Sequence, residues 1–392
     1  MNADRVVDIA VVGAGLVGTP LALMLSKHDL SVALVDKQSP NDNAALESRG
    51  FTALSHATVQ ILKQHDLWQR ASADACAIKQ VHVSHKGYFG ATRVSCQQLH
   101  VDALGHVVDN AHFISSIQSA LATSKLQHIS GAEVTQVEYA EHQATLHYKC
   151  NGHSSTVAAR LIVAVDGVSS FVRQSAGIQT TQTDYSQVGV LGTIELGEPH
   201  NGIAYERFTS TGPLALLPRP GNKASFVYCI NPEQQDSVHA MSDDEFMAQL
   251  QREFGFRLGR FQSIGARTLV PLLRIEATAA NAPRLLLLGN ALRLLHPVAG
   301  QGYNLAMRDA QALFEHVRGD VADPGNIELL EAFVASRRKD HQSVVRLTDT
   351  LARTFRGSAS IPAHIRALGL LGLDHVPPLR NAFTKRSMGY TG

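Results

Sequence analysis

The chain has 392 residues, of which 44% are hydrophobic and 18% are charged. This length and composition indicate about two globular domains and exclude an intrinsically disordered chain. The net charge of +1 argues against a nucleic-acid partner, because such a protein needs a basic face that neutralises phosphates. The charge is uneven, however, since the residues from Arg337 to the C-terminus include ten Lys/Arg and three Asp/Glu.

Cysteine usage and the N-terminal pattern limit the setting of the protein. The cysteines have no paired spacing, which fits a reduced, cytoplasmic compartment. His82 and His85 lie three residues apart, but no Cys or carboxylate set completes a metal site, so we expect none. The apolar run from Val6 to Leu25 is interrupted by Asp8 and by glycines and has no basic region before it. We therefore expect neither a cleaved signal nor a transmembrane helix.

The first motif with chemical content lies at the N-terminus. A β-rich run at residues 6–12 is followed by Gly13, Gly15 and Gly18, then by a helical pattern, and a second strand at residues 31–36 ends in Asp36. The first two glycines allow a tight turn and close approach of a pyrophosphate, and the third lets helix and strand pack. Asp36 can accept a hydrogen bond from a ribose hydroxyl. These residues together predict a dinucleotide-binding βαβ unit.

A second motif follows the buried strand predicted at residues 161–165. Asp166 and Gly167 stand at the carboxyl end of this strand, and Arg173 follows at turn spacing. The motif suits contacts to ribose hydroxyls and phosphate. It is equally compatible with a helix cap in which Asp166 or Ser169 accepts hydrogen bonds from backbone N–H groups.

The third motif lies late in the chain. Residues 285–288 predict a buried strand, residues 289–302 a glycine-rich turn, and Leu305 and Leu313 have helical spacing. Such a turn presents backbone N–H groups and the positive end of a helix dipole, which favours a ligand that becomes anionic.

Between these motifs the pattern indicates a second architecture. From about residue 185 to 273, short strands broken by Gly and Pro predict a mainly antiparallel sheet, and residues 242–245 form a capping box that opens a helix. The predicted fold class is α/β, with a Rossmann-like nucleotide-binding domain, an inserted mainly antiparallel β-sheet domain and a helical C-terminus. The predicted boundaries are 1–80, 100–184 and 276–340 for the nucleotide-binding domain, 81–99 and 185–275 for the inserted domain, and 341–392 for the C-terminal segment.

The C-terminal segment has a pattern of its own. From Ile365 to Arg386, leucines stand among basic residues. A packed or solvated helix pair explains this pattern, and so does a contact with an anionic membrane surface or a partner protein.

The three turns, taken in order, resemble the pattern of the flavin-dependent aromatic hydroxylases, also called group A flavoprotein monooxygenases. That pattern combines the N-terminal fingerprint, D-G-x-x-S-x-x-R at residues 166–173, and a late motif ending in P-x-x-G-x-G-x-N at residues 297–304. Residues 207–218 and 289–309 are most similar to the ubiquinone-biosynthesis hydroxylases of this family. Asn290 stands where most of the family has an acid, and Asp36 where Glu is commoner.

The resemblance implies that FAD extends along all three turns. The residues implied for the ADP half are Gly13, Gly15, Gly18 and Asp36, with Arg49 and Asn110 nearby. Asp166 would contact the middle of FAD, with Arg173 close to it. The residues implied for the ribityl chain and the isoalloxazine ring are Gly289, Asn290, Gly300, Gln301, Gly302 and Asn304. The expected wall opposite the flavin consists of Leu214, Leu216, Phe226 and Tyr228. No catalytic residue is identified, and His296 and Pro297 are candidates by position alone.

The implied reaction hydroxylates a polyprenylated phenol of ubiquinone biosynthesis. NAD(P)H, bound transiently because no second fingerprint is present, would reduce FAD, and O2 would then give a flavin C4a-hydroperoxide whose distal oxygen reaches the ring. An apolar enclosure would keep water from this intermediate. The resemblance also implies peripheral association with the inner membrane face or with other ubiquinone-biosynthesis enzymes. The alternatives are a prenyl-chain reductase, a non-catalytic FAD-binding subunit of a quinone-synthesis complex, or a hydroxylase of a soluble aromatic acid, for which Arg207 or Arg219 would supply a basic group.

Overall fold

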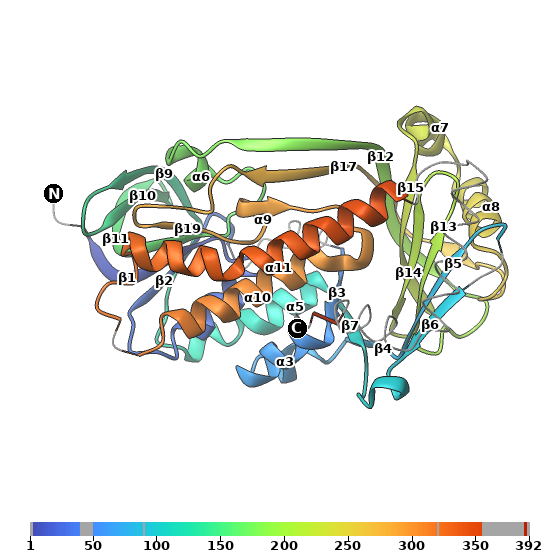
Figure 1. The fold of residues 1–392 in the computed structure, drawn as a ribbon, viewed down its shortest axis with the longest axis horizontal. Helices are drawn as coiled ribbons and strands as arrows, with labels where there is room; N and C mark the ends of the chain where they lie inside the picture. Colours follow the sequence, from blue (N-terminus) through green and yellow to red (C-terminus); the bar gives the residue numbers. More distant parts are fainter. Residues whose placement is uncertain (1–2, 40–49, 89–90, 320, 355–387, 390–392) are drawn as a thin grey trace.

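The computed structural model describes residues 3–39, 50–88, 91–319, 321–354 and 388–389. A parallel sheet with its covering helices forms one end of the molecule, and an upright antiparallel sheet forms the other (Figure 1). Two long strands, β12 (Thr180–Glu195) and β17 (Thr268–Ala277), run from one end to the other. The predicted fold class is confirmed.

The parallel sheet is built from apolar runs rich in Val, Ile and Leu, which suit strands buried on both faces. Its strand order is β18-β19-β11-β1-β2-β8, and Val12 at the end of β1 lies opposite both Val35 of β2 and Ala164 of β11. The carboxyl ends of these strands therefore share one edge, where ligands of such sheets bind. The bounds are β1 Arg5–Val12, β2 Val32–Asp36, β8 Gln127–Ser130, β11 His153–Ala164, β18 Asn281–Ala282 and β19 Leu285–Leu287. A hairpin of β9 (Ala132–Tyr139) and β10 (Ala144–Cys150) extends the sheet from β11.

Helices bury their apolar faces against this sheet. Leu21 and Met24 of α1, Ile117 of α5 and Met307 of α10 share one core with Ile9 of β1. The helices of this part are α1 Gly18–Leu25, α3 His56–Gln64, α4 Trp68–Ala71, α5 Asn110–Gln118, α6 Phe171–Ser175, α9 Gly289–Leu292, α10 Gln301–His316 and α11 Ile327–Thr354. A small antiparallel sheet of β3 (Phe51–Ser55), β7 (Gly105–Asp109) and β4 (Cys76–Ile78) lies between the two large sheets (Figure 1). Short 3-10 turns occur at Gln97–Leu99, Leu121–Thr123, Pro232–Gln234 and Val298–Gly300.

The inserted sheet has the strand order β20-β17-β12-β15-β14-β13-β5-β6, and all its neighbouring pairs are antiparallel except β13 with β5. Its further strands are β5 Gln80–His85, β6 Ala91–Ser95, β13 Ile203–Phe208, β14 Pro213–Arg219, β15 Lys223–Ile230, β16 Ser263–Ile264 and β20 Arg293–Leu294. Helices α7 (Gln235–Ala240) and α8 (Asp243–Phe254) cover its outer side (Figure 1). The capping box that opens α8 is confirmed, since Ser242 and Glu245 exchange side-chain and backbone hydrogen bonds.

Two details depart from the sequence pattern. Strand β12 begins at Thr180, before the predicted start of the inserted sheet at about residue 185, because its first residues pair with β17 near the parallel sheet. Strand β20 belongs to the inserted sheet although it follows residue 276. The chain therefore returns once more to the inserted sheet before α10 begins.

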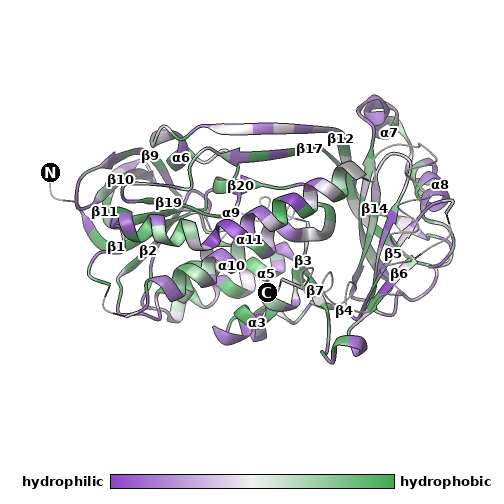
Figure 2. Cartoon of the chain, viewed as in Figure 1, coloured by the Kyte–Doolittle hydropathy of each residue, from purple (hydrophilic) through white to green (hydrophobic). Residues whose placement is uncertain are grey.

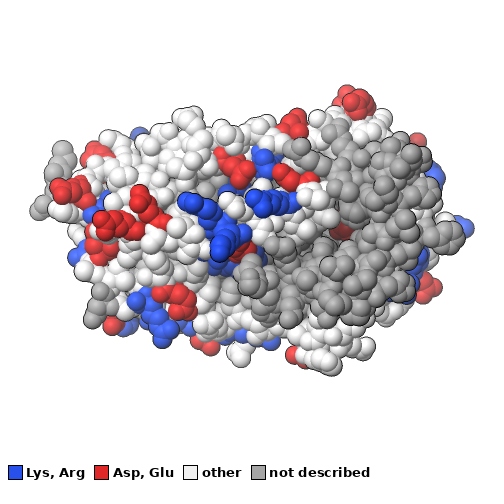
Figure 3. Space-filling model, in the orientation of Figure 1, with Lys and Arg blue, Asp and Glu red and all other residues white. Residues whose placement is uncertain are grey.

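A buried ion cluster joins α10 to α11, which carries both polar and apolar residues along its length (Figure 2). Arg308 binds Asp340 through two nitrogens, at 2.9 and 3.0 Å, and Arg337 binds Asp309 at 2.7 Å and also Asp340. Burial by itself would raise the pKa of Asp340, but the two guanidiniums hold it below its usual value. On the visible face, basic and acidic side chains are intermixed over these helices (Figure 3). No helix among the described residues is long and apolar enough to cross a membrane.

We predict that Asp340→Asn lowers the free energy of unfolding by about 3 kcal/mol, because it leaves two guanidiniums without their shared carboxylate. Chemical denaturation at pH 7 measures this change. Glu331→Gln, at an exposed position on the same helix, is the matched control and should change stability by less than about 0.5 kcal/mol. Equal effects of the two substitutions would contradict a stabilising role for the cluster.

Candidate active site

The first turn lies directly after β1, at the shared edge of the parallel sheet. Gly13 has φ +109°, and a Cβ there would lie 2.6 Å from the carbonyl oxygen of Val165. A Cβ on Gly18 would lie 1.7 Å from the carbonyl oxygen of Gly13. Gly15, in contrast, has no atom within 4 Å of its Cβ position. Two glycines therefore allow close packing, and the third leaves open space in front of the turn.

Asp36 ends β2 beside this turn. One carboxylate oxygen accepts from the backbone N–H of Ala14, and the other accepts from the N–H of Gln38 at 2.6 Å. Since an ionised carboxylate offers about four acceptor positions, two protein bonds leave capacity for a hydroxyl of a ligand. The acid and the glycine turn, predicted to act together, are adjacent in the structure.

The second turn follows β11 and does cap a helix. The Oδ2 of Asp166 accepts from the N–H of Val172 at 3.3 Å. Ser170, rather than the predicted Ser169, is the N-cap of α6 and accepts from the N–H of Arg173 at 3.0 Å. The Oδ1 of Asp166 is buried and has no hydrogen-bond partner in the part of the chain that the structure describes, and burial raises the pKa of this carboxyl. One oxygen therefore serves the cap, and the other remains for a ligand.

The Arg173 side chain joins the second turn to the third. It is 5% exposed, and its guanidinium donates to the carbonyl oxygen of Ala291 at 2.9 Å and to that of Val168 at 2.9 Å. Ala291 belongs to α9 in the third turn, 118 residues away. These two hydrogen bonds of Arg173 hold the second and third turns in position. The closeness of Arg173 to FAD, which the resemblance implied, stays a prediction.

The third turn meets the first. Gly289 has φ +56°, and a Cβ there would lie 3.7 Å from the Val17 side chain. Gly300, also in the left-handed region at φ +57°, is the N-cap of α10 and makes no side-chain cap. The positive end of the dipole of this 16-residue helix therefore lies at the third turn, where it favours an anionic group. The Cβ position of Gly302 has no atom within 4 Å, and the Asn290 side chain is exposed.

Asn304 holds this turn in place with all of its amide atoms. Its Oδ1 accepts from the N–H of Ser55 at 2.8 Å and from the hydroxyl of Thr58 at 2.7 Å. Its Nδ2 donates to the carbonyl oxygens of Ala53 at 3.0 Å and Gly300 at 2.7 Å. A side chain with four protein bonds has a positioning role, so at this position only the backbone faces a ligand. Gln301 is buried at the start of α10.

His296 and Pro297, the positional candidates for catalysis, differ in burial. His296 is 1% exposed, and its Nδ1 accepts from the N–H of Val298 at 3.1 Å. Burial lowers the pKa of His296 to about 4, so the ring is neutral near pH 7. The ring lies edge-on to Tyr185 of β12, with 4.9 Å between centroids, whereas Pro297 is exposed. His296 is therefore a packed contact between the third turn and the inserted sheet.

The four residues predicted to form the substrate wall lie on the other side of the sheet. Leu214, Leu216, Phe226 and Tyr228 are at most 2% exposed and share a core with Phe246 of α8. The prediction of this wall was wrong because alternate residues of a strand point to opposite faces, and α8 covers the face that carries the largest side chains. The side toward the parallel sheet carries the alternate residues, among them Ala204 and Leu217, which pack against Phe51 and Ala53 of β3.

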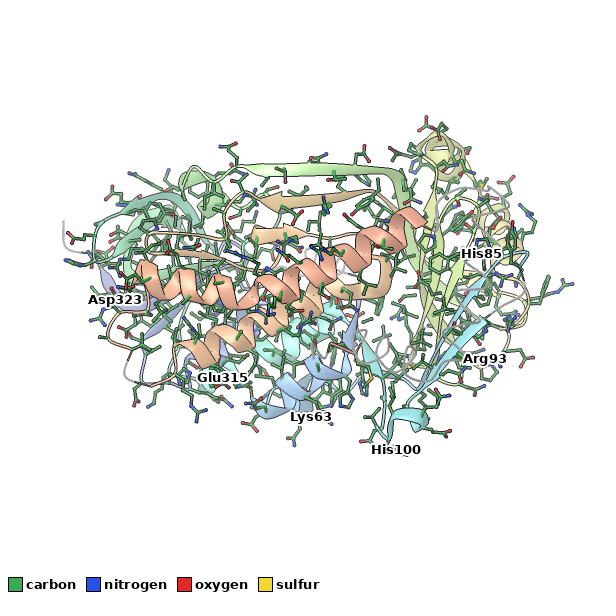
Figure 4. The ribbon with its side chains drawn as sticks, in the orientation of Figure 1. Lys63, His85, Arg93, His100, Glu315 and Asp323 are labelled. Carbon is green, nitrogen blue, oxygen red and sulfur yellow. The ribbon has the colours of Figure 1, made fainter. Side chains whose placement is uncertain are left out.

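The two arginines considered for a soluble acid also lie on opposite faces. Arg207 donates to the carbonyl oxygen of Glu253 in α8 at 3.0 Å, on the outer side. Arg219 lies 3.5 Å from the centroid of the Phe51 ring, on the side toward the parallel sheet, and burial lowers its pKa. Because Arg207 lies on the outer side, it is unavailable to a substrate between the two sheets. Figure 4 shows the edge of the same sheet, where His85 lies on β5 and Arg93 on β6.

Two further predicted contacts lie near the first turn in sequence. Arg49 lies outside the described residues. Asn110 is buried at the start of α5, whose N-cap Asp109 accepts from the N–H of His112 at 3.0 Å. The contact of either residue with FAD stays a prediction.

The arrangement fits FAD. Three turns from distant parts of the chain meet at the edge of the parallel sheet, and open space lies at Gly15, Gly167 and Gly302. The N-terminus of α10 and the buried Oδ1 of Asp166 supply a positive dipole end and an acceptor along the same edge. A long cofactor with a ribose at one end, a pyrophosphate in the middle and a ring that becomes anionic at the other end matches this distribution.

Comparison with known proteins supports this conclusion. Residues 6–348 match the model of the FAD binding domain family, so the chain belongs to this family. It is an FAD-dependent monooxygenase. The chain is 31% identical to "Ubiquinone hydroxylase UbiL" of Rhodospirillum rubrum, over 99% of this chain and 91% of that protein. It is 26% identical to "3-demethoxyubiquinol 3-hydroxylase" of Escherichia coli, over 97% of this chain and 98% of that protein.

Solved structures share the fold. The p-nitrophenol 4-monooxygenase PnpA from Pseudomonas putida is similar with a TM-score of 0.81 and 16% identity, over 99% of this chain and 100% of that one. PqsL of P. aeruginosa is similar with a TM-score of 0.76 and 20% identity, over 93% of this chain and 99% of that one.

We predict that Arg173→Ala lowers the free energy of unfolding by about 2–4 kcal/mol, because two buried carbonyl oxygens lose a charged donor. The two turns then separate, and FAD is lost more readily. Thermal unfolding and the FAD retained after dialysis measure these changes. Arg160→Ala is the matched control, since Arg160 also donates to a carbonyl oxygen, that of Ala322 at 3.0 Å, but is exposed. FAD retention by Arg173→Ala equal to that of the unsubstituted protein would contradict the positioning role.

Proposed function

We propose that this protein hydroxylates the ring of a polyprenylated phenol in ubiquinone biosynthesis. The observation that carries the proposal is the nearly full-length similarity to two proteins named as ubiquinone-pathway hydroxylases, together with a site that fits FAD. The motif at residues 289–309, with Asn290 in place of the usual acid, also resembles 2-octaprenyl-6-methoxyphenol hydroxylase within this branch.

In the overall reaction, the ring C–H, O2, NAD(P)H and one proton give a ring C–OH, NAD(P)+ and water. FAD, when bound, accepts the hydride from NAD(P)H and activates O2. Gly13, Gly15 and Gly18 allow the backbone to approach the pyrophosphate, and Asp36 accepts from a ribose hydroxyl. Asp166 Oδ1 is the acceptor for the middle of the cofactor.

The third turn serves the flavin ring. Gly289 and Asn290 are proposed to contact the ribityl chain, and the backbone of residues 300–302 the ring. The N–H groups at the start of α10 lower the cost of negative charge on the ring. Asn304 and Arg173 keep this turn in place through the hydrogen bonds to Ala53 and Ala291.

The apolar side of the inserted sheet serves the reaction by excluding water. Leu217 and Ala204 pack against β3, which adjoins Gly300. Water in this region would divert activated oxygen to peroxide. The substrate ring is proposed to lie near the small side chains of Ala204 and of Ala215, which is opposite Glu206.

We predict that the FAD-loaded protein oxidises NAD(P)H and forms a hydroxylated product at least about tenfold faster with a prenylated phenol than with small phenolic acids, because the prenyl chain adds binding energy. Product mass, NAD(P)H absorbance and peroxide together measure coupling. Faster coupled turnover of a small phenolic acid would favour the soluble-acid hydroxylase, with Arg219 as the basic group. FAD that NAD(P)H never reduces, with substrate present, would favour a non-catalytic subunit.

A polyprenyl chain partitions into the bilayer, so we also propose peripheral association with the inner membrane face or with partner enzymes. The proposed contact is the segment from Ile365 to Arg386, which lies outside the described residues and places leucines among basic residues.

We predict that a chain ending at Ser358 loses flotation with phosphatidylglycerol-containing vesicles, whereas the full chain floats with them. Because the shortened chain also lacks Met388, which is buried in a cluster with Ile78 and Val107, circular dichroism and FAD content check that it is folded. Phosphatidylcholine vesicles are the control for the charge, and Lys385→Gln with Arg386→Gln should reduce flotation of the full chain. A truncated protein that floats as well as the full chain contradicts the proposed contact.

A further inference from the structure

One carboxylate on the inserted sheet has no place in the site described so far. Glu206 lies in β13, opposite Ala215 of β14 and Val83 of β5. Residues directly opposite on neighbouring strands point to the same face, so the nearest cross-strand neighbours of this carboxylate are apolar.

The face that carries Glu206 is the one toward the parallel sheet. Alternate residues of a strand share a face, so Glu206 lies with Ala204 and opposite to Arg207. Ala204 packs against the small sheet that contains Ala53, whereas Arg207 contacts α8 on the outer side. Glu206 therefore points away from α8 and toward the FAD-binding part.

The third turn lies next to this face. A Cβ on Gly300 would lie 3.6 Å from the Cβ of Ala53, and Asn304 binds the carbonyl oxygen of Ala53. Ala53 and Ala204 belong to one apolar cluster. Glu206 is two residues beyond Ala204, about 7 Å along the strand. The carboxylate thus lies near the region between the inserted sheet and the turn proposed to hold the flavin ring.

Glu206 has no hydrogen bond or ion pair among the described residues. It is only partly exposed, and burial raises its pKa to about 7. The uncompensated carboxyl makes this apolar face less stable than Ala or Val would, and such groups are enriched at functional sites. The neighbouring Cys229 does not offset this loss of stability, because it is a buried thiol and burial raises its pKa as well.

We propose, on the basis of the proposed function, that the Glu206 carboxylate accepts the proton of the substrate phenol. The O–H electron pair stays on the ring oxygen and raises the electron density of the ring carbons, which favours attack on activated oxygen. As the new C–O bond forms, the O–O bond of the activated oxygen breaks. The same ring carbon then releases its hydrogen as a proton, which the other oxygen atom takes up on its way to water. Glu206 then returns its own proton to the ring oxygen, so its net protonation is unchanged.

If Glu206 accepts the phenol proton, the rate of hydroxylation depends on pH. Only the ionised carboxylate accepts a proton, so hydroxylation should rise as the pH rises through about 7 and fall below it. The titratable groups on this side of the other described strands include His85, Cys229 and Arg219, with Lys223 and Glu195 at the far ends of β15 and β12. Arg219 stacks on Phe51, and the raised pKa of Cys229 keeps that thiol neutral through this range.

Glu206→Gln tests the proposal in the FAD-loaded full chain, because it keeps the size of the side chain and removes the proton acceptor. With a phenol that the unsubstituted protein hydroxylates, product formation should fall about 10²-fold or more. FAD content and reduction by NAD(P)H should be retained, peroxide should replace product, and the rise in rate near pH 7 should disappear. Glu206→Asp should restore part of the product.

Glu253→Gln is the matched control, since Glu253 lies in α8 on the outer side of the same sheet and pairs with Lys86. This variant should keep the rate and pH profile of the unsubstituted protein. A Glu206→Gln variant that forms product at the unsubstituted rate, with the same pH profile, overturns the role of Glu206. An unsubstituted protein that hydroxylates no phenol instead overturns the proposed function.

A measurement without turnover tests the burial of the carboxyl. A group with a folded-state pKa above its unfolded value contributes stability below the unfolded value and loses it as the pH rises through the folded one. Glu206→Gln should therefore raise the Tm relative to the unsubstituted protein at pH 8.5 and leave it nearly equal at pH 5. Equal Tm values at both pH values would contradict an uncompensated carboxyl in an apolar region.

Discussion

The hydrogen bonds of the Arg173 guanidinium to two carbonyl oxygens join parts of the site that come from distant segments. The first turn depends on close backbone packing instead, with Gly13 against Val165 and Gly289 near Val17. No single turn can hold a cofactor as long as FAD. The site exists because a buried cation and a few glycines bring the strand ends together, and a Cβ or a missing guanidinium would separate them.

The two faces of the inserted sheet have different roles, because alternate residues of each strand point to opposite sides. Its outer face carries Phe226 and Tyr228, which pack under α8 and stabilise the sheet. Its inner face carries smaller side chains, such as Ala204, and the carboxylate of Glu206. Around Glu206 the inner-face residues Ala204 and Ala215 are small, and we place the substrate ring there.

Polar side chains at the site also fall into two groups. Asn304 has four protein hydrogen bonds, and Arg173 binds two carbonyl oxygens, so both hold the backbone in place. Asp166 Oδ1 and Glu206 have no hydrogen-bond partner among the described residues. Since an uncompensated carboxyl costs stability, the second group is where a ligand is expected to supply the missing contacts.

The local patterns alone determined much of this protein. The glycine fingerprint with Asp36, the acid at the end of β11 and the late glycine turn depend on neighbours in sequence, and the structure places them at the ends of four adjacent strands, β2, β1, β11 and β19. The capping box of α8 and the order of sheet types were predictable for the same reason. Only the tertiary structure decided which face of the inserted sheet lies toward the FAD-binding part. Alternation of residues defines two faces of a strand, but it does not determine what each face packs against. The tertiary structure also decided the roles of Arg173, Asn304 and Glu206, since each depends on contacts, or on their absence, with residues far away in the sequence.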